Sequence, residues 1–325
     1  MRIVSAAITA LWLGLPGGLS GGRALAQTYP DHPVKIIVPS SPGGGFDVVG
    51  RVIAERLQRQ YGQAFVIENR TGAGTLVGTE AGLQSPADGY TLMVGGLSNM
   101  ALNPGLYAKI AYDPVKDFTP LGLVVSWSYT LISRKDPPYR DLRSMIDYAR
   151  ANPEKLTVAY GKGSGQHIAI AALENATGVK FLYVPYRGAQ PVYQDLLSGR
   201  IDMYFDNSQT ALPQVEAGAV IPLAVSSRMR QAFHPDVPTV SETGLAQMDM
   251  ETWFGLYAPA ATPKPIVETL RSSLSRIATD PEVMALFRKI GGRPLNMTPE
   301  ETVAFVKVEL DRWTKLLKQI GVTAD

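Results

Sequence analysis

The feature that most constrains the fold is a strand followed directly by a Gly- and Ser-rich turn and then by an amphipathic helix. Residues 34–39 have the apolar pattern of a short strand, residues 40–45 form the turn, and apolar residues between 48 and 61 recur with the period of a helix. Similar units follow at 65–84 and 90–99. Consecutive units of this kind predict an α/β fold with a right-handed, mostly parallel, doubly wound sheet.

A second series of alternating strands and helices begins after a long apolar strand at 121–133. Helices are predicted at 142–151, 168–177 and 190–197, and strands at 157–160, 181–184, 202–207 and 221–225. An extended segment at 252–259 and helices at 265–278 and 299–320 complete the chain.

The length of the chain favours two domains. A single hydrophobic core stops growing near 300 residues, and this chain has 325. The extended segments at about 121–133 and 250–258 are the natural crossings between two lobes. We therefore predict a first domain of residues 28–128 plus 255–325 and a second domain of residues 129–254.

The N-terminus predicts export. Met1 and Arg2 form a short positive region, residues 3–15 are apolar but too short to span a bilayer, and residues 24–26 read Ala-Leu-Ala. We interpret residues 1–26 as a secretory signal peptide, and a bacterial periplasm as the location of the mature chain. A buried N-terminal helix is the alternative, but Gly and Pro between residues 16 and 22 would break it.

Composition excludes several functions. Of the 31 Lys and Arg residues, Arg2 and Arg23 lie in the predicted signal peptide, so 29 remain against 29 Asp and Glu. A neutral chain with dispersed charges is not expected to bind nucleic acid, and no later stretch is apolar enough for membrane insertion of the mature chain. With no Cys, three isolated His and no phosphate-binding fingerprint, neither a metal nor a cofactor is predicted.

The Gly-rich turns are the candidate binding site. Such turns expose backbone N–H groups, and a helix N-terminus adds partial positive charge, so an anion can be held without Lys or Arg. All would lie at the carboxyl ends of strands, where open α/β sheets bind ligands, in a cleft between the domains. The candidate residues are Pro42, Gly43, Gly44, Gly45, Phe46, Asp47, Ser98, Asn99, Gly163, Ser164, Gly165, His167, Gly188, Ala189, Asp206 and Asn207.

Each candidate also has a purely structural interpretation. Gly after a strand is ordinary turn chemistry, and Asp47 is expected to cap the helix that follows it. Phe46 and Trp127 could be core residues or aromatic walls for a ligand. Asp206 and Asn207 could be turn residues or could bind a polar or amino group of the ligand.

A serine hydrolase is the enzymatic alternative. It would use Ser164 with His167 or His234 and an acid such as Asp206. The Gly-x-Ser-x-Gly elbow is absent, because Lys and Gln stand where its glycines are required. His167 falls where a helix begins and more simply caps it or lines the cleft.

The chain resembles the Bug-type extracytoplasmic solute receptors of tripartite tricarboxylate transporters. The resemblance is carried by PGGGFD at 42–47, ENRTGAG at 68–74, PADGYTL at 86–92, DFTP at 117–120, VPYRG at 184–188, PDVPT at 235–239 and WFGL at 253–256. It implies a two-domain, Venus-flytrap periplasmic-binding-protein fold that closes on a small carboxylate, without catalysis, and delivers it to membrane subunits of a transporter. It also implies that backbone groups and ordered waters at 42–47, 98–99, 161–167, 188–189 and 206–207 hold the carboxylate. A receptor that signals to a sensor kinase would have the same cleft.

Overall fold

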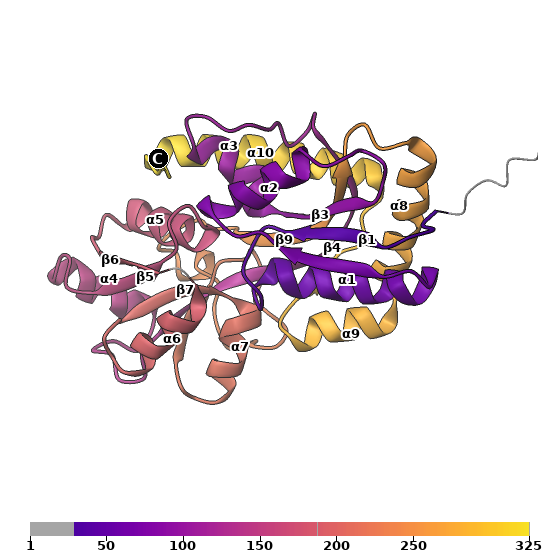
Figure 1. The fold of residues 1–325 in the computed structure, drawn as a ribbon. Coiled ribbons are helices and arrows are strands. Elements are labelled where there is room, and N and C mark those ends of the chain that lie inside the picture. Colours follow the sequence, from indigo (N-terminus) through magenta and orange to yellow (C-terminus); the bar gives the residue numbers. More distant parts are fainter. Residues whose placement is uncertain (1–28, 187, 325) are drawn as a thin grey trace, which may run out of the picture.

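The computed structural model describes residues 29–186 and 188–324, so the predicted signal peptide lies outside the described residues. The chain forms two lobes side by side, each with a sheet covered by helices (Figure 1). We call them lobe 1, which contains the chain from Tyr29, and lobe 2, which contains the middle of the chain.

The sheet of lobe 1 is mixed. Its strands, in spatial order, are β2 (Phe65–Asn69), β1 (Val34–Val38), β3 (Thr91–Gly96), β9 (Glu251–Pro259), β4 (Phe118–Ser133) and β10 (Arg293–Pro294). The first three strands are parallel, whereas β9 is antiparallel to both β3 and β4, and β10 is antiparallel to β4. The parallel part is the one that the strand–turn–helix units predict.

The sheet of lobe 2 has the same mixture. Its order is β6 (Leu182–Pro185), β5 (Thr157–Tyr160), β7 (Met203–Asn207), β4 and β8 (Ile221–Val225). Strands β6, β5 and β7 are parallel, and β4 is antiparallel to β7 and β8. In both lobes every antiparallel pair of these strands includes β4 or β9.

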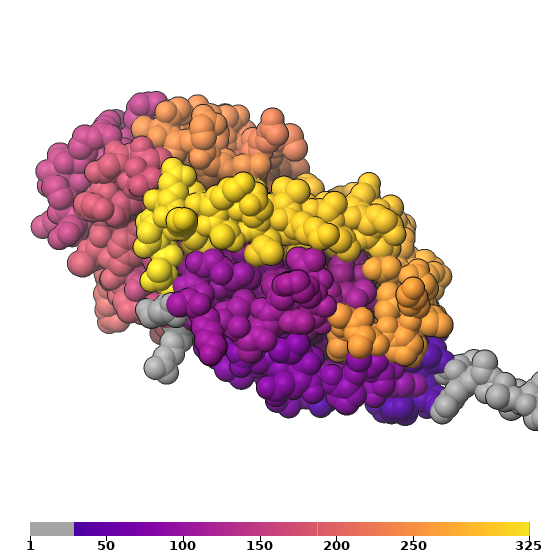
Figure 2. Space-filling model, turned by 90° about the horizontal axis from the view of Figure 1, so that it is seen from above, coloured from indigo at the N-terminus to yellow at the C-terminus, as the bar shows by residue number. Residues whose placement is uncertain are grey.

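Helices cover the sheets of both lobes. Lobe 1 carries α1 (Gly45–Tyr61), α2 (Leu76–Leu83), α3 (Asn103–Leu106), α8 (Lys264–Thr279), α9 (Pro281–Lys289) and α10 (Pro299–Ile320). Lobe 2 carries α4 (Leu142–Ala151), α5 (Gly165–Thr177), α6 (Ala189–Leu197) and α7 (Ser208–Glu216). Figure 2 shows α10, in yellow, running along lobe 1 and reaching lobe 2.

Strand β4 belongs to both sheets. Its residues from Phe118 to Ser128 pair with β9, and its residues from Tyr129 to Ser133 pair with β7. The change of partner falls at the domain boundary that the sequence predicts, although β9 pairs with the lobe 1 sheet from Glu251 onward, earlier than residue 255. The domain limits therefore stay a proposal.

The shared strand fixes how the two sheets face each other. Strand β9 is antiparallel to both β3 and β4, so β1, β2 and β3 run in the direction of β4, toward lobe 2. Strand β7 is antiparallel to β4, so β5, β6 and β7 run back toward lobe 1. The carboxyl ends of both sets of parallel strands therefore meet at the lobe junction.

Three helices were not predicted from the sequence: α3, α7 and α9. Helix α3 has only four residues. Helix α7 contains Pro213, which is unusual within a helix and hides the pattern. Helix α9 begins after Asp280, whose side chain accepts hydrogen bonds from the first turn, with Pro281 at the first helical position. An Asp-Pro pair before an amphipathic segment is a helix-start signal, so the sequence held the information for α9.

Close strand packing at the crossing requires glycine at one position. A Cβ atom on Gly255 would lie 2.0 Å from the carbonyl oxygen of Gly122 and 2.8 Å from Leu123 Cδ2. These contacts join β9 to β4 where the crossing strands are most buried, so backbone would have to move to admit a methyl group.

We expect Gly255→Ala to lower the free energy of unfolding by about 3 kcal/mol, because an overpacked interior forces backbone shifts. Denaturant unfolding followed by circular dichroism would measure it. Gly188→Ala is the control, since a Cβ atom there meets nothing within 4 Å, and its effect should stay within about 0.5 kcal/mol. Equal stability of the two variants would contradict the packing argument.

Candidate functional site

The N-terminus of α1 is the first part of the candidate site. The helix begins at Gly45, and Gly44 precedes it with extended backbone and no side chain to cap it. The first intrahelical bond runs from Val48 N–H to Gly44 C=O at 3.0 Å, so the preceding amides of the first turn have no intrahelical acceptor. These N–H groups point toward the lobe junction and can bind an anion.

Asp47 does not cap α1 as the sequence suggested, because the helix starts two residues earlier. From the first turn its carboxylate reaches back and accepts a hydrogen bond from Gly43 N–H at 2.9 Å. Arg51 Nε donates to the same oxygen, Oδ2, at 2.9 Å, and Asn69 Nδ2 donates to Oδ1 at 2.9 Å. Asp47 thus fastens the Gly-rich turn to α1 and to β2.

The electrostatics of Asp47 follow from these contacts. Its side chain is buried, and burial opposes ionisation, but the hydrogen bonds together with the Arg51 charge outweigh burial and lower the pKa of Asp47. The carboxylate is therefore ionised and compensated at neutral pH. It orders the turn while its charge is balanced beside the helix N-terminus.

The N-terminus of α5 is the second part of the site. Ser164 caps it, and its Oγ accepts a hydrogen bond from His167 N–H at 3.3 Å. The amides of Gly165 and Gln166 precede the first intrahelical bond, from Ile168 to Ser164, and have no acceptor within the helix. Helix α5 begins three residues before the predicted start because the Ser164 cap extends it into the Gly-rich turn.

Tyr129, on β4, was missed in the sequence, where it stands in a continuous apolar strand with nothing to single it out. A Cβ atom on Gly165 would lie 2.0 Å from Tyr129 Oη, so the hydroxyl sits against the first residue of α5. Tyr129 is 2% exposed, and burial raises its pKa, so its hydroxyl is neutral at physiological pH. Glycine at 165 is thus required by the close approach of this neutral hydroxyl.

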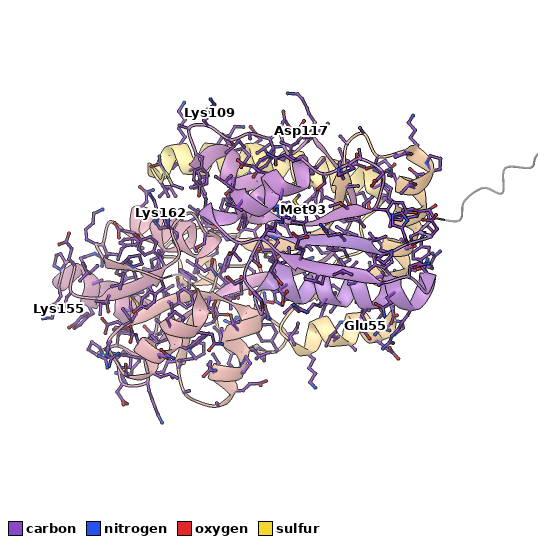
Figure 3. All side chains as sticks on the ribbon, viewed as in Figure 1. Glu55, Met93, Lys109, Asp117, Lys155 and Lys162 are labelled. Atoms are coloured by element: carbon purple, nitrogen blue, oxygen red, sulfur yellow. The ribbon has the colours of Figure 1, made fainter. Side chains whose placement is uncertain are left out.

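The loop of Gly163 contacts lobe 1. A Cβ atom on Gly163 would lie 3.3 Å from Ala324 Cβ and 3.7 Å from Tyr107 Oη. Figure 3 shows the neighbouring Lys162 at the side of lobe 2 that faces lobe 1. The turn before α5 therefore lies at the junction, as the strand directions require.

Asp206 and Asn207 end β7. Asp206 is 1% exposed, and its carboxylate accepts hydrogen bonds from Tyr193 Oη at 2.6 Å, Thr210 Oγ1 at 2.5 Å and Asn207 N–H at 2.8 Å. These bonds connect β7 to α6 and α7. Burial, the largest effect, raises the pKa of Asp206 to about 6 despite the hydrogen bonds.

Asn207 has an unused acceptor. Its Oδ1 is buried and has no hydrogen-bond partner within the part of the chain that the structure describes. A buried acceptor of this kind is costly unless water or a ligand donates to it.

The remaining candidates divide between the surface of the junction and the core. Gly188 is exposed and precedes α6, with Ala189 as the first helical residue. Phe46 packs edge-on against Phe254, with ring centroids 4.8 Å apart, inside the core of lobe 1. Asn99 is fully buried, and its Oδ1 accepts a hydrogen bond from Gly96 N–H at 2.8 Å.

Three further residues named in the sequence analysis lie in the turn after β1, in the segment after β3 and in the core. Ser98 lies two residues after the end of β3 and begins a short π-helix, η2 (Ser98–Leu102), that carries Asn99. Pro42 is exposed in the turn after β1. Trp127 is 1% exposed and donates from Nε1 to Ile290 C=O at 3.1 Å, so it is a core residue.

The hydrolase arrangement is not assembled among the described residues. Ser164 Oγ contacts the backbone N–H of His167, while His167 Nδ1 faces Gly163 N–H at 3.4 Å. Burial, aided by Lys162, lowers the pKa of His167 and favours the neutral imidazole that accepts this bond. The carboxylate of Asp206 is occupied by Tyr193 and Thr210.

The family of the chain is shown by comparison with known proteins. Residues 49–322 match the family model described as the tripartite tricarboxylate transporter family receptor. The chain belongs to this receptor family. The receptor is 32% identical to Protein BugT of Bordetella pertussis over 298 residues, which cover 91% of each chain.

Solved structures share the fold of the receptor. The structure of R. palustris Rpa4515 with adipate is 33% identical, has a TM-score of 0.86, and is matched over 91% of this chain and 99% of that one. The periplasmic binding protein BugD is 34% identical with a TM-score of 0.84, over 91% and 99%. MatC from Rhodopseudomonas palustris with bound malate is 32% identical with a TM-score of 0.82, over 89% and 100%. The two-domain periplasmic-binding-protein fold expected from the sequence is confirmed.

No described helix of the receptor is long and apolar enough to cross a membrane.

We expect Asp47→Ala to lower the free energy of unfolding at neutral pH by about 2 to 3 kcal/mol, because the partners of the carboxylate lose their acceptor. The pKa of Asp47 is lowered in the folded state, so its contribution is present above the unfolded pKa near 4 and is lost as the pH falls through the folded value. Denaturant unfolding of both proteins across acid pH measures this.

Asp147→Ala is the matched control, since Asp147 forms an exposed ion pair with Arg150 on α4. Its effect should stay within about 0.5 kcal/mol. An Asp47→Ala variant that is as stable as this control would contradict the role of Asp47 in the turn.

The raised pKa of Asp206 predicts a contribution to stability with the opposite pH dependence. Its pKa is raised to about 6, so its contribution to stability is greatest below pH 4 and falls as the pH rises through 6. The stability difference between the native receptor and Asp206→Asn should therefore decrease by about 3 kcal/mol over this interval. Asp195→Asn is the control of opposite sign, because the bonds from Tyr186 and Arg200 lower the pKa of Asp195. A flat difference for Asp206→Asn would contradict its burial as a carboxylate.

Proposed function

We propose that the receptor binds a small organic carboxylate at the lobe junction, in the periplasm, and delivers it to the membrane subunits of a tripartite tricarboxylate-type transporter. The observation that carries this proposal is the pair of helix N-termini, α1 in lobe 1 and α5 in lobe 2, at strand ends that face the same junction. Each offers backbone N–H groups that no helical acceptor uses.

The charge of the site supports an anionic ligand. A helix N-terminus carries roughly half a positive charge, and the two termini come from different lobes. A carboxylate that accepts hydrogen bonds from both would favour the closed arrangement of the lobes, which is the differential affinity that a closing receptor needs. The adipate and malate of the related structures are dicarboxylates of the kind that could use both termini.

Asn207 supports a ligand that also carries a donor. Its buried Oδ1 lacks a partner, and a hydroxyl, an ammonium group or an ordered water would supply one. We include Gly188 and Ala189 in the proposed site because the N-terminus of α6 follows the neighbouring strand, β6.

The first experiment is a thermal-stability screen of the mature receptor with millimolar citrate, malate, adipate, acidic amino acids and aromatic acids. A ligand present at 1,000 times its dissociation constant adds about 4 kcal/mol, which gives a shift on the order of 5 to 10 °C. We expect one class of carboxylate to produce it. Absence of any shift, with no retained ligand in the denatured extract by mass spectrometry, would contradict the proposal.

Variants then test the site with the ligand found in the screen. Gly44→Val should block approach to the α1 amides and abolish binding in isothermal titration. Ser164→Ala should cost about 1 kcal/mol of affinity. Thr298→Ala is the control, since Thr298 caps the remote N-terminus of α10, and its loss removes a cap without touching the junction. Unchanged affinity in Gly44→Val would place the ligand elsewhere.

Delivery requires its own measurement. Uptake of the labelled ligand should depend on the receptor and on the membrane subunits together. If uptake persists without those subunits, the receptor does not feed this transporter, and a sensory role becomes the better explanation.

A further inference from the structure

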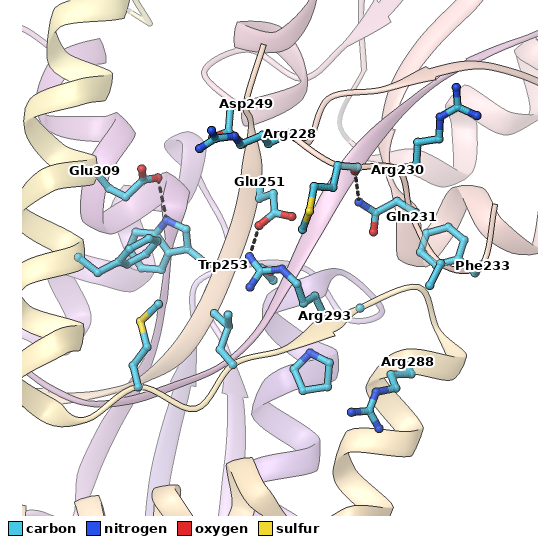
Figure 4. A pocket seen from close by; sticks show the side chains of 18 of the residues that line it. Arg228, Arg230, Gln231, Phe233, Asp249, Glu251, Trp253, Arg288, Arg293 and Glu309 are labelled. Carbon is cyan, nitrogen blue, oxygen red and sulfur yellow. Dashed lines mark hydrogen bonds and ion pairs between the residues drawn. The ribbon is translucent and has the colours of Figure 1, made fainter. Parts of the chain in front are cut away.

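A pocket lies away from the strand ends at the junction. It has a volume of about 820 Å³ and opens between the loop at 228–233, the start of β9, and the segment from β10 to α10 (Figure 4). None of the candidate residues of the junction lines it. It is therefore separate from the proposed carboxylate site.

Both lobes contribute to this pocket, which we call the hinge pocket. Arg228 and Met229 follow β8 of lobe 2, whereas Arg293 and Phe305 belong to lobe 1. The lobes touch beside it, because a Cβ atom on Gly291 would lie 3.2 Å from the Phe233 ring. A molecule in the hinge pocket would contact both sides of the crossing.

One wall of the hinge pocket is apolar. Trp253 and Phe305 pack edge to face with ring centroids 5.5 Å apart, and Leu295 and Met297 continue the wall. Apolar and aromatic walls with a few polar groups are typical of organic-ligand pockets, whose usual volumes are roughly 300–1,000 Å³. The size admits a molecule larger than a small dicarboxylate.

The charged lining is predominantly basic. Its ionisable residues are Arg228, Arg230, Arg288, Arg293 and Arg312 against Asp249, Glu251 and Glu309.

Much of this charge is already paired. Arg293 pairs with Glu251 (Figure 4), and Arg230 pairs with Glu242, outside the lining, at 2.9 Å. Glu309 is 6% exposed and is occupied by Arg312 at 3.0 Å and by the indole N–H groups of two tryptophans, one of them Trp253 at 3.2 Å.

Two arginines of the hinge pocket have no acidic partner within the described chain, Arg228 and Arg288. Arg228 comes from lobe 2 and Arg288 from the last turn of α9 in lobe 1. Both are exposed at the pocket and present guanidinium groups, which bind carboxylate, sulfonate and phosphate oxygens well.

A buried hydroxyl at the pocket also lacks a partner. Ser126, on β4, is 2% exposed, lies in register between Trp253 and Arg293, and lines the hinge pocket. Its Oγ has no hydrogen-bond partner in the described chain. A buried polar atom is usually satisfied, so this hydroxyl suggests a polar atom of a bound molecule or a water.

We propose that the hinge pocket is a second binding site, for an amphipathic organic anion. The apolar part of the ligand packs on Phe305 and Met297, and its anionic group binds Arg228 at one end of the pocket or Arg288 at the other (Figure 4). These arginines belong to different lobes, so both lobes contribute to the site. This site does not depend on the carboxylate site at the junction.

Anilinonaphthalene sulfonate, a fluorescent amphipathic anion, is the probe for the test. We expect saturable binding of one molecule per receptor, and about tenfold or greater loss of affinity in the double variant Arg228→Glu, Arg288→Glu. The control is Arg140→Glu with Lys155→Glu, the same charge change at exposed positions of lobe 2. Figure 3 shows Lys155 at the far end of that lobe. The control should retain the affinity.

The junction variant Gly44→Val separates the two sites, and it should bind the probe as the native receptor does. The proposal is overturned if the probe does not saturate, if the Arg228 and Arg288 changes leave its affinity unaltered, or if the control variant loses as much. It is also overturned if Gly44→Val, folded by circular dichroism, loses the probe, because the probe then occupies the junction.

Discussion

Strand β4 is hydrogen-bonded into two sheets at once, and the position of the candidate site depends on that bonding. Its first part is held by β9 and its last part by β7 and β8. Since the partners are antiparallel to it on both sides, the parallel strands of lobe 1 run toward lobe 2 and those of lobe 2 run back. The direction of the strands alone therefore places every Gly-rich turn that follows a parallel strand at this junction.

The junction gains positive potential from backbone groups of both lobes. The amides at the starts of α1 and α5 supply it, and the negative charge of the nearby Asp47 carboxylate is compensated by Arg51. This separates ligand binding from net charge, which is close to zero in the predicted mature chain. Glycine is needed at position 165 for a steric reason, because the Tyr129 hydroxyl leaves no room for a side chain there.

The sequence predicted the elements whose signals are local. The strand at Val34–Val38, the αL glycine that ends α1 at Gly62, and the final helix Pro299–Ile320 all follow from periodicity and turn chemistry. Helix α9 is an exception, because its local Asp-Pro signal was overlooked. Most of the site contacts that the sequence did not predict depend on distant partners. Asp47 became a bridge to Asn69 instead of a cap, and Tyr129 approached Gly165 only because β4 carries it to the N-terminus of α5. The hinge pocket joins residues that are far apart in the chain, so no spacing pattern marks it.

Lobe 1 is built from both ends of the described chain, and this has a consequence for the order in which the receptor assembles. Strands β1, β2 and β3 are complete within the first hundred residues, but β9, which covers the edge of β3, and helix α10 come from residues beyond 250. Lobe 2 has most of its strands in one continuous segment. Contacts between distant segments form slowly, so during synthesis the lobe that begins first is finished last. Until then, β3 keeps an open edge that another chain could pair with.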